Sequence, residues 1–213
     1  MGYELENDIL VDNNLAKGYP FAHFAKKGKD WQITLSCESG THWAQVAYQL
    51  AHEICHLYCN YDQCSGHKHQ WFEESLCECA SIAVLDRISL DWKKSQMMAY
   101  SPDYGDSVAS YITGVKDSAI NQIKNQTQFV EWLSGHIDDL ESSSMLRDLN
   151  RVVALYMYNS LLESNPNNWV SITTINTWNC FSNENFNEFQ DSWLAASNKN
   201  LTEVEMITSL LRE

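Results

Sequence analysis

The chain has 213 residues, a length at which one domain can bury a substantial core, so we expect a single domain over residues 1–213. The formal net charge of −14 argues against binding to nucleic acid or to anionic membranes, because both favour basic surfaces. The sequence has no apolar run of membrane-spanning length and no visible signal peptide, so we expect no membrane partner and a location in the cytoplasm.

The first forty residues are expected to form a small sheet. Residues 8–12 (DILVD) predict a short strand, and residues 31–36 (WQITLS) predict a second strand with alternating apolar positions. Extended peptides can add to an exposed sheet edge through main-chain hydrogen bonds. Residues 31–37 could therefore pair with a substrate backbone, and an ordinary interior strand is the alternative. Residues 39–41 (SGT) then indicate the start of a helix.

Residues 42–59 are predicted to form a helix that carries a His-Glu-x-x-His motif. Residues four apart lie on the same helix face, so His52 and His56 can point their imidazoles at one metal ion. Glu53 lies on the neighbouring part of the helix surface, where it can reach a metal-bound water without binding the metal. The alternative is an ordinary core or surface helix whose two histidines bind no metal.

A third metal ligand has to come from another part of the chain, because catalytic zinc usually has three protein ligands and one open position. His67 and His69 follow in a loop, where histidines are usually just solvated. A second helix is predicted over residues 72–94, and two acidic residues lie one turn apart on it. We predict that Glu74 completes the site and that Glu78 supports one histidine, His52 in particular, from behind. A solvated acidic stripe is the alternative.

The two predicted helices together resemble the gluzincin zinc peptidases, the group that contains thermolysin and the aminopeptidase N type enzymes. The resemblance covers residues 43–81 and is strongest to short bacterial and plant members of uncharacterised function. In the aminopeptidase branch the third ligand lies in a Trp-x-Asn-Glu segment, where Trp71 matches the Trp, Glu73 the Asn and Glu74 the ligand. The spacing from the second histidine is slightly shorter here, so Glu73 is the alternative ligand. In the thermolysin branch an acid four positions later supports the first histidine, and Glu78 occupies that position.

The resemblance implies a zinc-dependent peptidase that acts on peptide or protein substrates. Bound Zn²⁺ would lower the pKa of its water to about 7, and Glu53 would take a proton from that water and pass it to the leaving amine. A Tyr or His donor would stabilise the developing oxyanion. The candidates for this donor are Tyr100, Tyr104, Tyr111 and His136. Asp148 and Arg151 could line the cleft, with a surface ion pair on a helix as the alternative.

Seven cysteines are present, and most of them lie in or near the motif. These are Cys55, Cys59, Cys64, Cys77 and Cys79, with Cys37 and Cys180 outside. The odd count and the length of the chain disfavour a disulfide scaffold, and small buried thiols in a reducing compartment are the simplest interpretation. The alternative is a structural metal site, although the spacing lacks the paired Cys-x-x-Cys of zinc ribbons. Its ligands would be Cys59, Cys64, Cys77 and Cys79.

Further helices are expected near residues 104–118, 127–140, 147–163, 184–197 and 202–211. The predicted fold class is α+β and mostly helical, with a small N-terminal sheet followed by a helical bundle and zincin-like active-site helices. Residues 1–40 form the sheet region, 41–97 the metal-site helices and 98–213 the helical part. Two other functions stay open: a non-catalytic zinc-binding interaction module, and a helical interaction domain in which the motif arose by chance. The presence of Glu53 favours the enzyme, since a structural site needs no general base.

Overall fold

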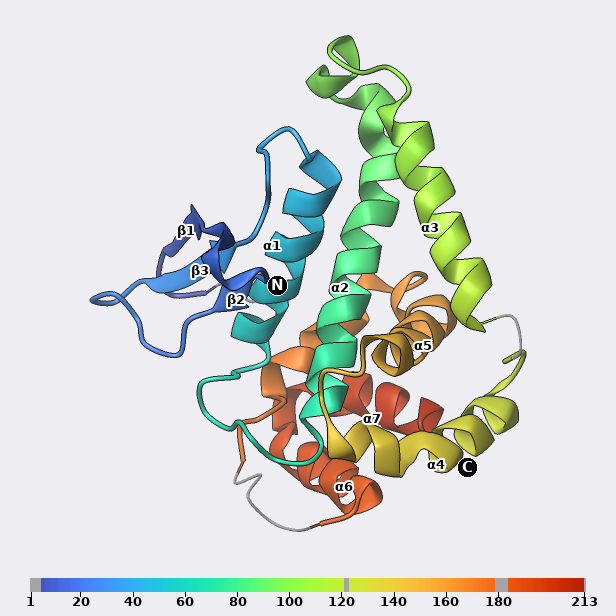
Figure 1. The fold of residues 1–213 in the computed structure, drawn as a ribbon. Helices are drawn as coiled ribbons and strands as arrows, with labels where there is room; N and C mark the ends of the chain where they lie inside the picture. The colour runs from blue at the N-terminus through green and yellow to red at the C-terminus, as the bar shows by residue number, and fades with distance from the viewer. Residues whose placement is uncertain (1–4, 121–122, 179–183, 213) are drawn as a thin grey trace.

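The computed structural model describes the backbone of residues 5–120, 123–178 and 184–212, and their side chains except at 118–120. The protein is 65% helical, with a small three-stranded sheet near the N-terminus followed by helices, so the predicted fold class is confirmed. Figure 1 shows the sheet at one side of the molecule, next to helix α1, and the other helices on the opposite side of α1. Within the described residues, no helix is both long and apolar enough to cross a membrane.

The sheet contains β1 (Ile9–Asn13), β2 (Phe21–Ala22) and β3 (Trp31–Leu35) in the order β1-β3-β2. β1 pairs with β3 in parallel, and β2 pairs with it antiparallel, so that Phe21 lies opposite Thr34. The strand predicted over residues 31–36 is therefore an interior strand, and it offers no free edge to a substrate. The sheet edge that lies near the metal-site helices belongs to β2, whose two residues are too few to show alternation in the sequence.

The alternation along β3 explains how the sheet packs. Trp31, Ile33 and Leu35 are exposed by only 7%, 0% and 5%, and they form a hydrophobic cluster with Leu57 and Tyr61. Val46, Leu50 and Ile54, which lie four residues apart along one side of α1, pack against the same cluster. This cluster fixes the sheet against α1 and thereby places β2 beside the motif.

The next two helices are α1 (Trp43–Tyr58) and α2 (Gln70–Asp91), close to the predicted residues 42–59 and 72–94. Figure 1 shows them side by side and running in opposite directions, joined by the loop of residues 59–69. The last turns of α1 therefore face the first turns of α2. Because the motif lies near the end of α1 and the acidic residues near the start of α2, the short connection brings them together.

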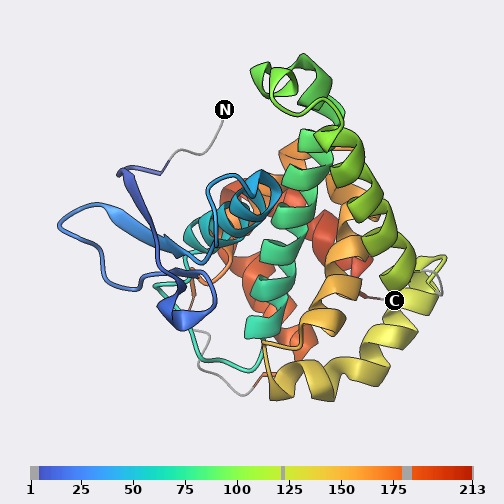
Figure 2. The ribbon, with the colours of Figure 1, turned by 45° about the horizontal axis from the view of Figure 1, so that its top comes forward.

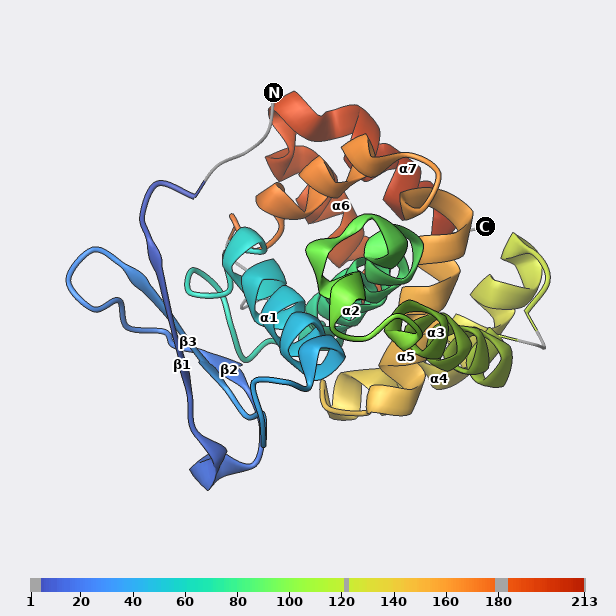
Figure 3. The same ribbon diagram turned by 90° about the horizontal axis from the view of Figure 1, so that it is seen from above.

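The remaining helices agree with the five that were predicted. They are α3 (Tyr104–Ile120), α4 (Gln126–Ser142), α5 (Arg147–Met157), α6 (Phe186–Ala196) and α7 (Leu201–Leu210). Shorter helical turns cover Leu15–Lys17, Trp92–Lys94, Gln96–Ala99, Tyr158–Leu162, Pro166–Thr174 and Asn198–Asn200. Figure 3 shows α2 between α1 on one side and α3 and α5 on the other, and Figure 2 shows the sheet standing apart from α2 beyond α1. α2 is thus the central helix.

Aromatic packing anchors the first turn of α2. The ring centroid of Trp71 lies 4.8 Å from that of Phe186, and the ring centroid of Phe72 lies 5.7 Å from that of Trp193. All four rings are buried, and such pairs contribute about 0.5–1.5 kcal/mol each beyond their area burial. Because Phe186 and Trp193 of α6 pack against Trp71 and Phe72, α6 holds the start of α2, which carries Glu74, in place.

Candidate metal centre

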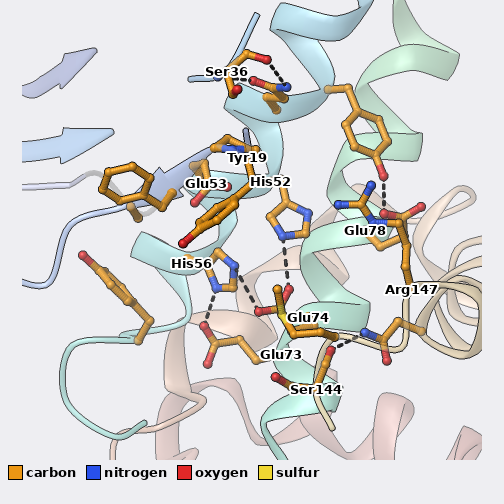
Figure 4. Close-up of a pocket in the computed structure, with 18 of the residues that line it drawn as sticks. Tyr19, Ser36, His52, Glu53, His56, Glu73, Glu74, Glu78, Ser144 and Arg147 are labelled. Atoms are coloured by element: carbon orange, nitrogen blue, oxygen red, sulfur yellow. Dashed lines mark hydrogen bonds and ion pairs between the residues drawn. The ribbon is translucent and has the colours of Figure 1, made fainter. Parts of the chain in front are cut away.

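The carboxylate of Glu74 faces both motif histidines. His52 Nε2 lies 3.3 Å from Glu74 Oε2, and His56 Nε2 lies 3.8 Å from Glu74 Oε1 (Figure 4). Two ligands that bind a tetrahedral zinc ion at about 2.0–2.1 Å lie about 3.3 Å apart. The three side chains that were predicted as ligands therefore lie together, with one Glu74 oxygen facing each imidazole. The donor atoms that all lie within 4.8 Å of one another are those of His52, His56 and Cys77.

Glu73 contacts His56 from the opposite side of the ring. Glu73 Oε1 lies 2.6 Å from His56 Nδ1, and Asn176 Nδ2 donates to Glu73 Oε2 at 2.6 Å. The same Asn176 amide donates to the Cys59 carbonyl at 3.0 Å. A carboxylate on Nδ1 fixes the tautomer of a ligating histidine and leaves Nε2 free for the metal. The geometry thus favours Glu74 as the ligand and Glu73 as the acid that supports His56.

Glu78 does not make the predicted contact with His52, and this prediction is corrected. Arg151 Nε donates to Glu78 Oε1 at 2.8 Å, and the Tyr48 hydroxyl donates to Glu78 Oε2. Glu78 is only 4% exposed, so it is not a solvated acid either. Arg151 reaches this position from α5, which the sequence could not place next to α2. The ion pair between Arg151 and Glu78 is partly buried. Asp148 is exposed, and no ion pair with Arg151 is found for it among the described residues.

The motif opens onto a cavity of about 560 Å³. Glu53 lines this cavity together with His52 and His56 and is itself only 3% exposed. Burial raises the pKa of Glu53, while the two histidines and a hydrogen bond from the Ala22 backbone lower it, and the net direction is upward. A raised carboxyl pKa makes the carboxylate a stronger base, which suits the predicted role.

Carboxylates dominate the electrostatics around the histidines. Burial by itself lowers the pKa of His56, but hydrogen bonding and attraction to Glu73, with further attraction to Glu74 and Glu53, raise it to about 10. Burial raises the pKa of Glu73, although His56 and Asn176 oppose this shift. These directions show that the surroundings strongly favour positive charge at His56. A divalent cation placed there would meet the same attraction.

None of the four predicted oxyanion donors lines this cavity. Tyr104 accepts a hydrogen bond from Ala44 N at 2.8 Å, and His136 Nδ1 lies 2.7 Å from the Trp132 carbonyl. Tyr100 and Tyr111 are exposed by 79% and 55%. The sequence offered these four residues as candidates without selecting one, because it does not show which helices border the motif.

The cavity contains three other tyrosines, namely Tyr19, Tyr48 and Tyr61. The hydroxyl of Tyr48 is bound to Glu78, and that of Tyr61 donates to the His23 carbonyl. Tyr19 is 53% exposed, and no hydrogen bond of its hydroxyl is found within the described part of the chain. Tyr48 could have been identified from the sequence, because it lies four residues before the first histidine on the same helix face.

His67 and His69 do not join the motif histidines in any described contact. His69 is 2% exposed, and its Nε2 lies 2.9 Å from the Glu184 carbonyl while its Nδ1 lies 3.3 Å from Glu141 Oε1. The ring of His67 stacks on that of Phe189 at 5.6 Å between centroids. The loop histidines are thus packed against α4 and α6 rather than solvated, and they are not brought to the proposed metal position.

Cys77 is a further possible donor near the histidines. One nitrogen each of His52 and His56 and the Sγ of Cys77 all lie within 4.8 Å of one another. However, Cys77 is fully buried, whereas the Glu74 side chain is 17% exposed and lines the cavity. A catalytic zinc ion needs an open position for water and substrate, and this requirement favours Glu74 as the third ligand.

The predicted alternative metal site of four cysteines is not assembled. Cys59 and Cys77 lie together, but they are grouped with Cys55 and not with Cys64 or Cys79. All six described cysteines are buried and free, as expected for thiols that are not in disulfides; Cys180 lies outside the described residues.

Comparisons with known proteins add no assignment, because no family model, no curated protein and no solved structure matches the chain.

Proposed function

We propose that the protein is a zinc-dependent peptidase. The observation that carries this proposal is the position of Glu74, whose two oxygens face the Nε2 atoms of both His52 and His56. The Nδ1 atom of His56 is already occupied by Glu73, so Nε2 is the atom available to a metal. The gluzincin resemblance of the sequence points to the same three ligands.

The donor set and the cavity fit catalytic zinc. Two imidazole nitrogens and one carboxylate oxygen form a ligand set found in zinc hydrolases, and they leave a fourth position open. That position would face the cavity, since all three ligands line it. When bound there, Zn²⁺ would polarise a substrate carbonyl and activate a water near neutral pH.

The residues of this chain would then divide the remaining tasks. Glu53 would accept the proton that the attacking water loses, hold it, and donate it to the leaving amine. Glu73 would keep His56 in the required tautomer and orientation. Tyr19 is the cavity tyrosine that could donate a hydrogen bond to the developing oxyanion.

The sheet edge supports a peptide as the substrate. Phe21 and Ala22 line the cavity, and β2 pairs with β3 on one side only among the described strands. An extended peptide could add to the other side through main-chain hydrogen bonds and lie across the histidines. Arg147 is the one Lys or Arg among the described residues that line the cavity, so it offers a position for an acidic group of the substrate.

The decisive test is a Glu53→Gln variant of the full chain. Because Glu53 is not a proposed ligand, the variant should keep about one zinc per chain, while peptide turnover should fall by about 100-fold to 10,000-fold. Turnover would be measured with a library of quenched fluorescent peptides, and zinc by elemental analysis. Glu205→Gln is the matched control, because Glu205 is exposed on α7 and should change neither quantity.

The outcomes separate the candidate functions. Turnover by Glu53→Gln at the parent rate would contradict the mechanism. Stoichiometric zinc without turnover of any peptide would instead favour a non-catalytic zinc-binding interaction module, and absence of zinc would contradict both. The free thiols fit a reducing compartment, and a location in the cytoplasm is part of the same proposal.

A further inference from the structure

Three buried thiols meet between α1 and α2, behind the histidines. The Sγ atoms of Cys55 on α1, of Cys59 directly after the last residue of α1, and of Cys77 on α2 all lie within 4.8 Å of one another. Their exposed fractions are 3%, 0% and 0%. We propose that Cys55, Cys59 and Cys77 form a second metal site, which binds one soft, thiophilic Cu(I) ion through three thiolates.

The distances between the sulfur atoms suit such an ion. Three sulfurs bound in a plane at about 2.3 Å, the length of a zinc–thiolate bond, lie about 4.0 Å apart. The Sγ atoms of Cys55 and Cys59 are 3.9 Å apart. The third sulfur lies within 4.8 Å of both, so a shift of less than about 1 Å would complete the triangle.

Burial by itself does not explain this grouping. Cys37, Cys64 and Cys79 are buried to the same degree, yet none of them belongs to a cluster of donors within the described residues. A disulfide between Cys55 and Cys59 is a poor alternative, because their sulfurs are 3.9 Å apart and would have to approach to about 2.05 Å. Redox-sensing cysteines are also normally accessible to solvent, which these three are not.

The number and kind of donors select the metal. Thiolates are soft ligands that favour Cu(I), zinc and iron–sulfur clusters. Structural zinc is almost always bound by four ligands, and among the described residues no fourth donor lies within 4.8 Å of all three sulfurs. An iron–sulfur cluster normally requires four cysteines and room between them, and the short sulfur–sulfur separations leave no such room. A single Cu(I) ion needs only three sulfur ligands and fits between sulfurs that lie this close together.

The three thiols lie next to the motif histidines. Cys77 Sγ lies within 4.8 Å of one nitrogen each of His52 and His56, which line the cavity. Once bound, the Cu(I) ion would cross-link α1 to α2 directly behind the proposed zinc ligands. The proposal does not require peptidase activity, so it can be tested whether or not zinc chemistry is found.

The test is anaerobic titration of the full chain, as isolated and after incubation with excess zinc, with Cu(I) in the presence of a competing Cu(I) chelator. About one Cu(I) per chain should be retained, and X-ray absorption should show about three sulfur neighbours at about 2.3 Å. Cys77→Ser should weaken binding at least about 100-fold. Cys79→Ser is the matched control, since Cys79 lies on the same helix and is equally buried, and it should bind as the parent does.

Several results would overturn the proposal. They are failure of the parent to retain Cu(I) against the chelator, a copper shell dominated by nitrogen, and equal loss in Cys79→Ser and Cys77→Ser. Circular dichroism and thermal unfolding identify a variant that fails to fold. The absorption spectrum of the parent decides the matter in that case, because it needs no substitution.

Discussion

Glu73→Gln is expected to weaken zinc binding although Glu73 is not a proposed ligand. The two oxygens of Glu73 accept from two donors, His56 Nδ1 and Asn176 Nδ2, each at 2.6 Å. A glutamine amide offers one acceptor and one donor, so it can satisfy only one of these partners. If Asn176 reversed its amide to compensate, it would lose its bond to the Cys59 carbonyl.

The size of this effect follows from the role of such supporting acids. Their removal typically reduces metal affinity by about 10-fold to 100-fold, which is about 1.4–2.8 kcal/mol. We expect Glu73→Gln near the lower end, because the amide oxygen can still accept from His56, and Glu73→Ala near the upper end. Zinc affinity would be measured by competition with a zinc-binding fluorescent indicator.

Glu78→Gln is the matched control. Its carboxylate is just as buried, but its described partners are Arg151 and Tyr48 and not a histidine. Breaking a buried ion pair costs about 3–5 kcal/mol, and the lower end applies because Arg151 is partly exposed. Glu78→Gln should therefore lower the free energy of unfolding, measured by urea denaturation, while zinc affinity changes less than threefold. Equal loss of zinc affinity in the two variants would refute the assignment of Glu73 as the supporting acid.

Three further predictions concern the hydroxyl donor, the metal and the packing. Tyr19→Phe should lower kcat by about 100-fold at unchanged zinc content, and an unchanged kcat would exclude Tyr19 as the oxyanion donor. With free zinc at 100 times Kd, the free energy of unfolding of the parent should be about 2.7 kcal/mol higher than after removal of zinc by a chelator. His52→Ala should abolish this difference in denaturation experiments. Gly105→Ala places a Cβ 2.6 Å from Trp92 Cβ and should lower the free energy of unfolding by about 1–3 kcal/mol. In Gly114→Ala the new Cβ meets open space, so this control should be as stable as the parent or more stable in thermal unfolding.

The parts of the site that the sequence determined are local. The positions of His52 and His56 on one face follow from the helical repeat, which depends only on residues four apart. The order of a small sheet followed by helices follows in the same way from alternation and helical periodicity. The choice of Glu74 needed one more fact, namely that a short loop turns α2 back against α1.

The remaining features depend on residues that are distant in the sequence. The sequence predicted Glu78 beside a histidine, His52 in particular, but the acid at the Nδ1 atom of a histidine is Glu73, next to His56. Asn176, 103 residues further on, binds the second oxygen of Glu73. Glu78 instead accepts a hydrogen bond from Arg151, 73 residues away on α5. Periodicity fixes which residues share one face of one helix, but it leaves open how that helix is rotated against its neighbours. Only the packing of α2 between α1, α3 and α5 decides which acidic side chain meets which partner.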